Sequence, residues 1–156
     1  MGKVPSIRHN DTVVTECAAI CVYLADVFPD AELSPPPADR GDYYRWLFFA
    51  AGPLEAAVTN RSMGFELPPE GQKSAGYGSY DDVIDTLEAT VANKSYIARD
   101  RFSAADVYVG SQIGWGLQFG TLDKRAAFED YWARVHDREV YVRASNIDDA
   151  ALADSA

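Results

Sequence analysis

The sequence predicts a mostly α-helical protein that begins with a small unit of two strands and one helix. Three observations predict this fold class. Within residues 4–28, an extended, β-branched pattern gives way to apolar residues at helical spacing. Residues 29–39 contain three consecutive prolines, which favour a stiff, extended linker. Beyond residue 39 there are only helix signals, so the second and larger part is expected to be all-helical.

The opening segment contains signals for a hairpin followed by a helix. Residues 4–7, Val-Pro-Ser-Ile, favour an extended start, because proline fixes its own φ and keeps the preceding residue out of the α region. Residues 9–11 are a polar break that indicates a turn, and residues 12–14 are β-branched and favour a second strand. Thr15 can cap the following helix, with Glu16 in its first turn.

Five helices are predicted after the linker. Asp39 can cap the first, an aromatic helix that Gly52 and Pro53 are expected to bend before it ends near residue 58. Residues 63–77 are rich in glycine and proline and predict a loop, and residues 93–101 predict a shorter connection in which residues 96–98 are buried. The other four helices are expected at residues 80–91, 103–119, 124–135 and 138–144.

The helix at residues 103–119 has the strongest start signal. Ser103 is placed to cap it, and Asp106 can reach back to the N–H of Ser103, as in a capping box. Phe102 and Val107 can form a hydrophobic staple around this cap. Ser79 can cap the helix at residues 80–91.

Four glycines, at positions 110, 114, 116 and 120, lie in the same helical pattern. Each lowers helix stability by about 1 kcal/mol relative to alanine, so we expect them to allow close packing in a crowded centre. A ligand contact at Trp115 or Gln118 is an alternative use of this region.

The composition excludes several classes of function. The chain has 156 residues and a net charge of -10, which disfavours binding to nucleic acid or to an anionic membrane. It contains no apolar run of the roughly 18 residues that span a membrane, and no apolar signal segment at residue 1. Cys17 and Cys21 are therefore expected to be reduced thiols in a cytoplasm, and we predict no metal site.

The string GKVPSI…TVVTECAAICVYLADVFP resembles the glutathione-binding half of a glutathione transferase of the theta- or beta-like bacterial type. The FSAAD motif at residues 102–106 resembles the capping motif of that family's helical domain. The resemblance implies a truncated thioredoxin-like α/β fragment at residues 1–29, a linker at 30–39 and an all-helical C-terminal domain at 40–145. Residues 146–156 are acidic and alanine-rich, and we expect a flexible tail that frays.

The resemblance also implies which residues bind glutathione: Lys3, Val4, Pro5, Glu16 and Cys17. In the family, a cis Val-Pro bond leads into the hairpin, and a Glu-Ser pair opens the next helix. The chemistry suits an acidic tripeptide, because a helix N-terminus binds carboxylates and the backbone beside a cis proline can pair with an extended peptide. Lys3 can meet the glycine carboxylate of glutathione, or be only a solvated terminal charge.

Cys17 departs from the family pattern, because it stands where the family has serine. A thiol is a weaker hydrogen-bond donor than a hydroxyl, so this change lowers the expected affinity. Alternatively, Cys17 at a helix N-terminus can be a reactive thiol with a lowered pKa. Cys21 is expected in the core, and His9 and His136 are expected at a turn and at a helix end.

The family's first domain begins with a strand, a helix and a strand, and its catalytic Tyr, Ser or Cys follows the first strand. Met1 and Gly2 stand where that unit ends, so we expect this sequence to lack the thiol-activating residue. We therefore predict a transferase-like protein that in its complete form conjugates glutathione thiolate to apolar electrophiles. No cofactor is expected besides glutathione as co-substrate, and the protein is expected to be a homodimer.

Two other interpretations remain open. The first is a non-catalytic glutathione-binding or dimerisation module, and the second is a redox protein that uses Cys17 and Cys21. Four aromatic residues of the first helix after the linker are expected mostly in the core, with one or two lining an apolar electrophile pocket: Tyr43, Tyr44, Phe48 and Phe49. Asp81, Asp82 and Asp85 are expected on a solvated helix face.

Overall fold

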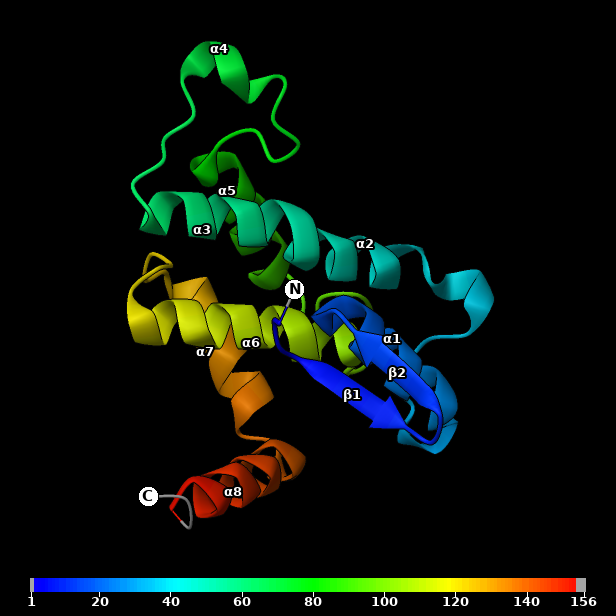
Figure 1. Cartoon of the computed structure of the whole chain (residues 1–156). Coiled ribbons are helices and arrows are strands. Elements are labelled where there is room, and N and C mark those ends of the chain that lie inside the picture. The colour runs from blue at the N-terminus through cyan, green and yellow to red at the C-terminus, as the bar shows by residue number, and fades with distance from the viewer. Residues whose placement is uncertain (1, 154–156) are drawn as a thin grey trace.

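A computed structural model describes residues 2–153 and shows a helical molecule with one hairpin at its N-terminal end (Figure 1). The N-terminal unit contains β1 (Ser6–His9), β2 (Thr12–Thr15) and α1 (Cys17–Val27). The elements that follow are η1 (Pro29–Ala31), η2 (Pro37–Asp39), α2 (Gly41–Phe49), η3 (Ala50–Leu54), α3 (Glu55–Ser62), α4 (Pro69–Gln72), α5 (Tyr80–Val91), α6 (Ala104–Phe119), α7 (Ala126–His136) and α8 (Glu139–Ala153).

The predicted fold class is confirmed. The described residues contain one two-stranded antiparallel sheet followed by α1, and the remaining described residues, up to Ala153, form helices and their connections. The expected loop at residues 63–77 holds the short helix α4. Across residues 2–153, no helix combines the length and hydropathy needed to cross a membrane.

The hairpin forms as predicted, but it ends one residue later than expected. Ser6 pairs with Thr15 and His9 with Thr12, and Asn10 adopts a left-handed φ of 55° in the two-residue turn. Because Thr15 is held in the strand by this pairing, it does not cap α1. Glu16 occupies the N-cap position instead of the first helical turn, so both expectations for these two residues were wrong.

The linker also changes a predicted cap. Residues 37–39 form the 3₁₀ turn η2, so Arg40 rather than Asp39 precedes α2. The Arg40 guanidinium donates to Asp26 of α1 at 2.7 Å and to the Pro35 carbonyl at 2.9 Å, which ties the linker to α1. Gly52 and Pro53 lie in the π-helical turn η3, which joins α2 to α3 without ending the helix.

Helix α6 lies at the centre of the molecule, between α1, α2 and α7 (Figure 1). Its start confirms the capping prediction, because Asp106 accepts from the N–H of Ser103 at 2.8 Å. The carboxylate is fully buried and also accepts from Ser103 Oγ at 2.8 Å, from the Ile97 N–H at 2.8 Å and from the Tyr131 hydroxyl at 2.7 Å. Asp106 therefore joins α6, α7 and the connection at residues 93–101.

The glycines of α6 have two different roles. A Cβ added at Gly114 would lie 2.7 Å from the Trp132 ring, and one added at Gly116 would lie 2.6 Å from Leu122. Gly110 is similarly close to Val135, at 3.0 Å. These three confirm the predicted close packing. Gly120 instead ends the helix in the left-handed conformation, with φ 70°.

The last helix, α8, extends further than predicted. It runs through Asn146, where we expected fraying to begin, and ends at Ala153; residues 154–156 lie outside the described part. None of its side chains is buried, and it lies at the edge of the molecule beside α7 (Figure 1). Residues 146–153 are therefore helical, while the flexibility of this tail stays a prediction.

We expect Asp106→Asn to lower the free energy of unfolding by about 3 kcal/mol, since the amide NH₂ would face the donors of Ser103 in a buried site. Chemical denaturation measures this change. Asp82→Asn is the matched control, because Asp82 makes the same capping box with Ser79 on the exposed start of α5. Its expected cost is about 1 kcal/mol. Equal losses in the two variants would contradict the role assigned to Asp106.

Gly114→Ala is expected to lower stability by about 2 kcal/mol, because the Trp132 ring must move to admit the new methyl group. Gly41→Ala, in the first turn of α2 with open space around it, is the control and is expected to be neutral or slightly stabilising. Thermal unfolding of both variants checks this pair. A neutral Gly114→Ala would show that the α6–α7 contact is loose.

Candidate functional site

The residues predicted to bind glutathione meet at one end of the hairpin. Strand pairing stops at Ser6 and Thr15, so the next residues on the two sides are Pro5 and Glu16. Lys3, Val4 and Pro5 are exposed, and the Val4–Pro5 bond is cis, as the resemblance implied.

The N-terminus of α1 opens at this end of the hairpin. Within the described chain, no side chain caps α1, and its first internal hydrogen bond runs from the Ile20 N–H to the Glu16 carbonyl at 2.9 Å. The N–H groups of Cys17, Ala18 and Ala19 are consequently without acceptors in the helix. Glu16 holds a left-handed backbone with φ 68°, a conformation that costs a non-glycine residue about 1–3 kcal/mol.

The Cys17 thiol interacts electrostatically with Glu55 of α3 and Tyr108 of α6, and sequence reasoning missed both residues. Glu55, at the start of α3, accepts from Gln112 Nε2 of α6 at 3.1 Å, and it acts electrostatically on both Cys17 and Tyr108. Burial is the main cause that raises the pKa of Tyr108, so its hydroxyl stays protonated at neutral pH. No local pattern marks these residues, because helix packing alone brings α1, α3 and α6 together.

The environment of Cys17 contradicts a thiol with a lowered pKa. Desolvation raises the pKa of Cys17 above its ordinary value, and the carboxylates of Glu55 and Glu16 raise it further. Desolvation is also the main cause that raises the pKa of Cys21 to about 11. A half-buried Cys21 packs against the core. Both raised pKa values favour protonated thiols near pH 7, which disfavours the redox interpretation.

The other residues singled out from the sequence occupy ordinary positions. His9 ends β1 and lies 3.0 Å from the Tyr23 hydroxyl, and His136 ends α7 and stacks on Trp132. Asp81, Asp82 and Asp85 are exposed, as predicted, and Ile97 is buried between two half-buried neighbours. Trp115 is 66% exposed, and Gln118 is also exposed.

The aromatic residues of α2 divide between core and surface. Tyr43 is buried and Tyr44 and Phe49 are half-buried, whereas Phe48 is 69% exposed. Desolvation is the main cause that raises the pKa of Tyr43 to about 12. None of the four lines either cavity found in the described chain. An electrophile pocket at these residues stays a prediction.

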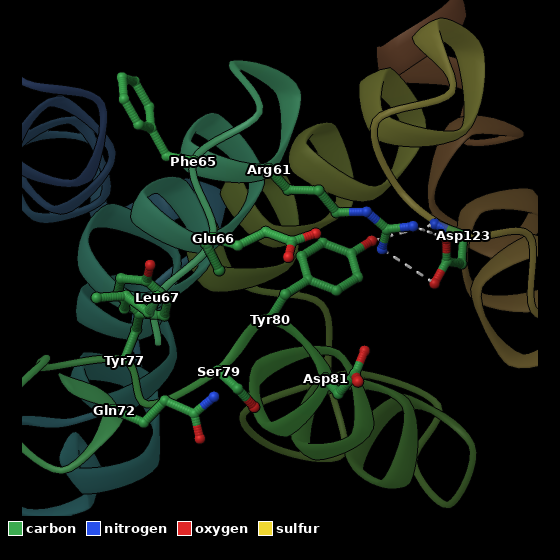
Figure 2. Close-up of a pocket in the computed structure, with 11 residues that line it drawn as sticks. Arg61, Phe65, Glu66, Leu67, Gln72, Tyr77, Ser79, Tyr80, Asp81 and Asp123 are labelled. Atoms are coloured by element: carbon green, nitrogen blue, oxygen red, sulfur yellow. Dashed lines mark hydrogen bonds and ion pairs between the residues drawn. The ribbon is translucent and has the colours of Figure 1, made fainter. Parts of the chain in front are cut away.

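One cavity, of about 420 Å³, lies where α3 ends and α5 begins (Figure 2). Arg61 extends across the ring of Tyr80, with its Cζ 3.9 Å from the ring centroid, and donates to both oxygens of Asp123 at 3.0 and 3.3 Å. None of the five predicted binding residues lines this cavity. In residues 2–153 there is also no group of three or more side chains suited to a metal ion.

Comparisons with known proteins support the family resemblance. The chain is 28% identical over 134 residues to glutathione S-transferase GstA of Escherichia coli O157:H7. A sphingomonad glutathione S-transferase solved in complex with glutathione superposes with a TM-score of 0.72 at 26% identity, covering 92% of this chain and 72% of that one. The chain is similar to glutathione S-transferases in sequence and in fold. No protein-family model matches it.

A second glutathione transferase structure, from Methylococcus capsulatus, gives a TM-score of 0.75 at 27% identity and covers 96% of this chain and 75% of that one. The chain spans only part of the length of these proteins. The match covers 81% of this chain but 66% of GstA, so this chain spans just under two thirds of that relative. Nearly all of the chain therefore has counterparts in glutathione S-transferases, while a part of each of them has none here.

The Cys17 thiol is expected to react with iodoacetamide slowly at pH 7, and its rate is expected to keep rising with pH beyond the ordinary pKa of a free thiol, about 8.5, before it levels off. The raised pKa keeps the thiol protonated below that range. In the Cys21→Ser variant only Cys17 can be alkylated, so mass spectrometry follows this thiol alone. The Cys17→Ser variant reports Cys21 in the same way and is the control. A rate that levels off below pH 8 would contradict the assigned environment.

Proposed function

We propose that this protein is glutathione transferase-like and binds glutathione with Lys3, Val4, Pro5, Glu16 and Cys17. In its complete form it conjugates the glutathione thiolate to apolar electrophiles. Residues 1–29 form the glutathione-binding part, residues 30–39 the linker and residues 40–145 the helical domain. We also propose a cytoplasmic location and a homodimer.

The observation that carries the proposal is the open N-terminus of α1 beside an unpaired strand end. Three N–H groups of α1 without acceptors, together with the helix dipole, suit the α-carboxylate of a γ-glutamyl group. The exposed carboxylate of Glu16 suits the neighbouring ammonium group. The Val4 backbone precedes the β1–β2 ladder and can pair with the extended cysteinyl unit.

The two ends of glutathione have different requirements. Lys3 is exposed and precedes Val4, so its ammonium can meet the glycine carboxylate at the far end of the peptide. Each charged group of glutathione then has a counterpart on the protein. The γ-glutamyl carboxylate meets the N-terminus of α1, the ammonium group meets Glu16, and the glycine carboxylate meets Lys3. The similarity to a transferase solved with glutathione bound supports glutathione as the ligand.

A non-catalytic glutathione-binding module is the second candidate, and the surroundings of Cys17 favour it. The charged groups that act on this thiol are the carboxylates of Glu16 and Glu55, which disfavour a nearby thiolate. Conjugation requires the thiol of glutathione to be ionised. The two candidates share the binding step and differ in catalysis.

We expect glutathione to bind, and Glu16→Gln to weaken binding at least tenfold, because the variant removes the charge and keeps the shape of the side chain. Isothermal titration calorimetry measures both constants. Glu129→Ala, an exposed carboxylate on α7, is the control and is expected to bind as wild type. Cys17→Ser is expected to bind several-fold more tightly, since a hydroxyl is the better donor.

Conjugation of glutathione to 1-chloro-2,4-dinitrobenzene distinguishes the two candidates. A rate above that of buffer supports the transferase. Binding without a rate above buffer supports the non-catalytic module. No measurable binding of glutathione would overturn both.

A further inference from the structure

A second cavity, of about 450 Å³, lies between α6, α7, α8 and the linker. We call it the α6–α8 groove. It is lined mainly by apolar side chains, among them Leu33, Val107, Trp132, Val135 and Val140. None of the residues proposed to bind glutathione lines it. Its volume is in the range of small-molecule sites, roughly 300–1,000 Å³.

The walls of the α6–α8 groove are fixed by contacts outside it. Leu33 of the linker accepts from the Ala104 N–H at 2.8 Å, which holds this segment against the start of α6. Trp132 packs edge-to-face on Tyr141 of α8, with ring centroids 5.5 Å apart, and its ring lies against Gly114. The groove therefore has a defined shape without a ligand, which lowers the entropy cost of binding.

Two charged residues line this groove in the described chain, and only one is available to a ligand. Asp106 is fully buried, and four donors already occupy its oxygens. Arg138 is half-buried, with its Cζ 3.5 Å above the Phe102 ring. Among residues 2–153 no carboxylate pairs with its guanidinium. In a chain with a net charge of -10, this apolar site thus presents a single positive group.

We propose that the α6–α8 groove binds an amphiphilic monocarboxylate, such as a medium-chain fatty acid. The carboxylate accepts hydrogen bonds from the Arg138 guanidinium, whose planar donors match its two oxygens. The alkyl chain lies along Val107, Val135 and Val140, where it removes apolar surface from water. Charge complementarity at Arg138 selects an anion over a neutral or cationic molecule with the same tail.

Titration calorimetry with decanoate tests the proposal on the full chain. Decanoate is expected to bind at least tenfold more tightly than decan-1-ol, and decyltrimethylammonium is expected not to bind. Arg138→Gln is expected to weaken decanoate binding about tenfold. Arg143→Gln, an exposed arginine of α8 that does not line the groove, is the matched control and is expected to bind as wild type.

A second variant separates binding from folding. Val107→Asp places a negative charge on an exposed position of α6 that lines the groove, and it is expected to abolish decanoate binding while circular dichroism stays unchanged. In two-dimensional amide NMR spectra, decanoate is expected to shift the Gly110 amide and the Trp132 indole N–H. Glutathione binding is expected to be the same with and without decanoate.

Four results would overturn the proposal. One is equal affinity for decanoate and decan-1-ol. Another is wild-type affinity in Arg138→Gln. A third is a set of NMR shifts at Glu16 and Cys17 instead of Gly110. The last is a concentration-dependent dimer that covers Val107 and Val140, since a second copy of the chain would then be the occupant of the groove.

Discussion

The fold depends on the buried carboxylate of Asp106. Its oxygens accept from two donors of Ser103, from the Ile97 N–H and from the Tyr131 hydroxyl, so one side chain fixes the start of α6, the connection before it and α7. A buried charge is tolerated only where donors surround it, and here they come from three separate segments. Both the end of α1 that is proposed to bind glutathione and the α6–α8 groove are built against the helix that Asp106 positions.

The proposed binding site has a rigid side and an open side. Helix α1 packs on α6 and is tied to the linker through Asp26 and Arg40, so its N-terminus is held in place. On the open side, Glu16 is exposed and adopts a strained left-handed backbone. A residue held in such a conformation without a local need is frequently part of a ligand site. Pro5 and Glu16 are the next residues on the two sides of one hairpin end, so the strain at Glu16 supports the ligand site proposed there.

Local signals in the sequence predicted much of this structure. The caps at Ser79 and Ser103 and the two-residue hairpin turn depend on residues a few positions apart, and all three are present. The predictions that were wrong concern cap residues that belong to a neighbouring element instead. Thr15 is held in the strand by Ser6, and η2 displaces Asp39 from the cap of α2. The cluster of Cys17, Glu55 and Gln112 requires three helices to meet, so no spacing in the sequence predicts it.

The π-helical turn at Ala50–Leu54 has a consequence for the surroundings of Cys17. A π turn holds one more residue than an α turn, and each residue of an α-helix advances by roughly 100° about the axis. Everything C-terminal to η3 is therefore rotated by about that angle relative to an uninterrupted helix. Glu55 is the first residue after this turn. Were the turn regular, the Glu55 carboxylate would be aimed at a different side of the bundle, and the thiol of Cys17 would lack its strongest electrostatic neighbour.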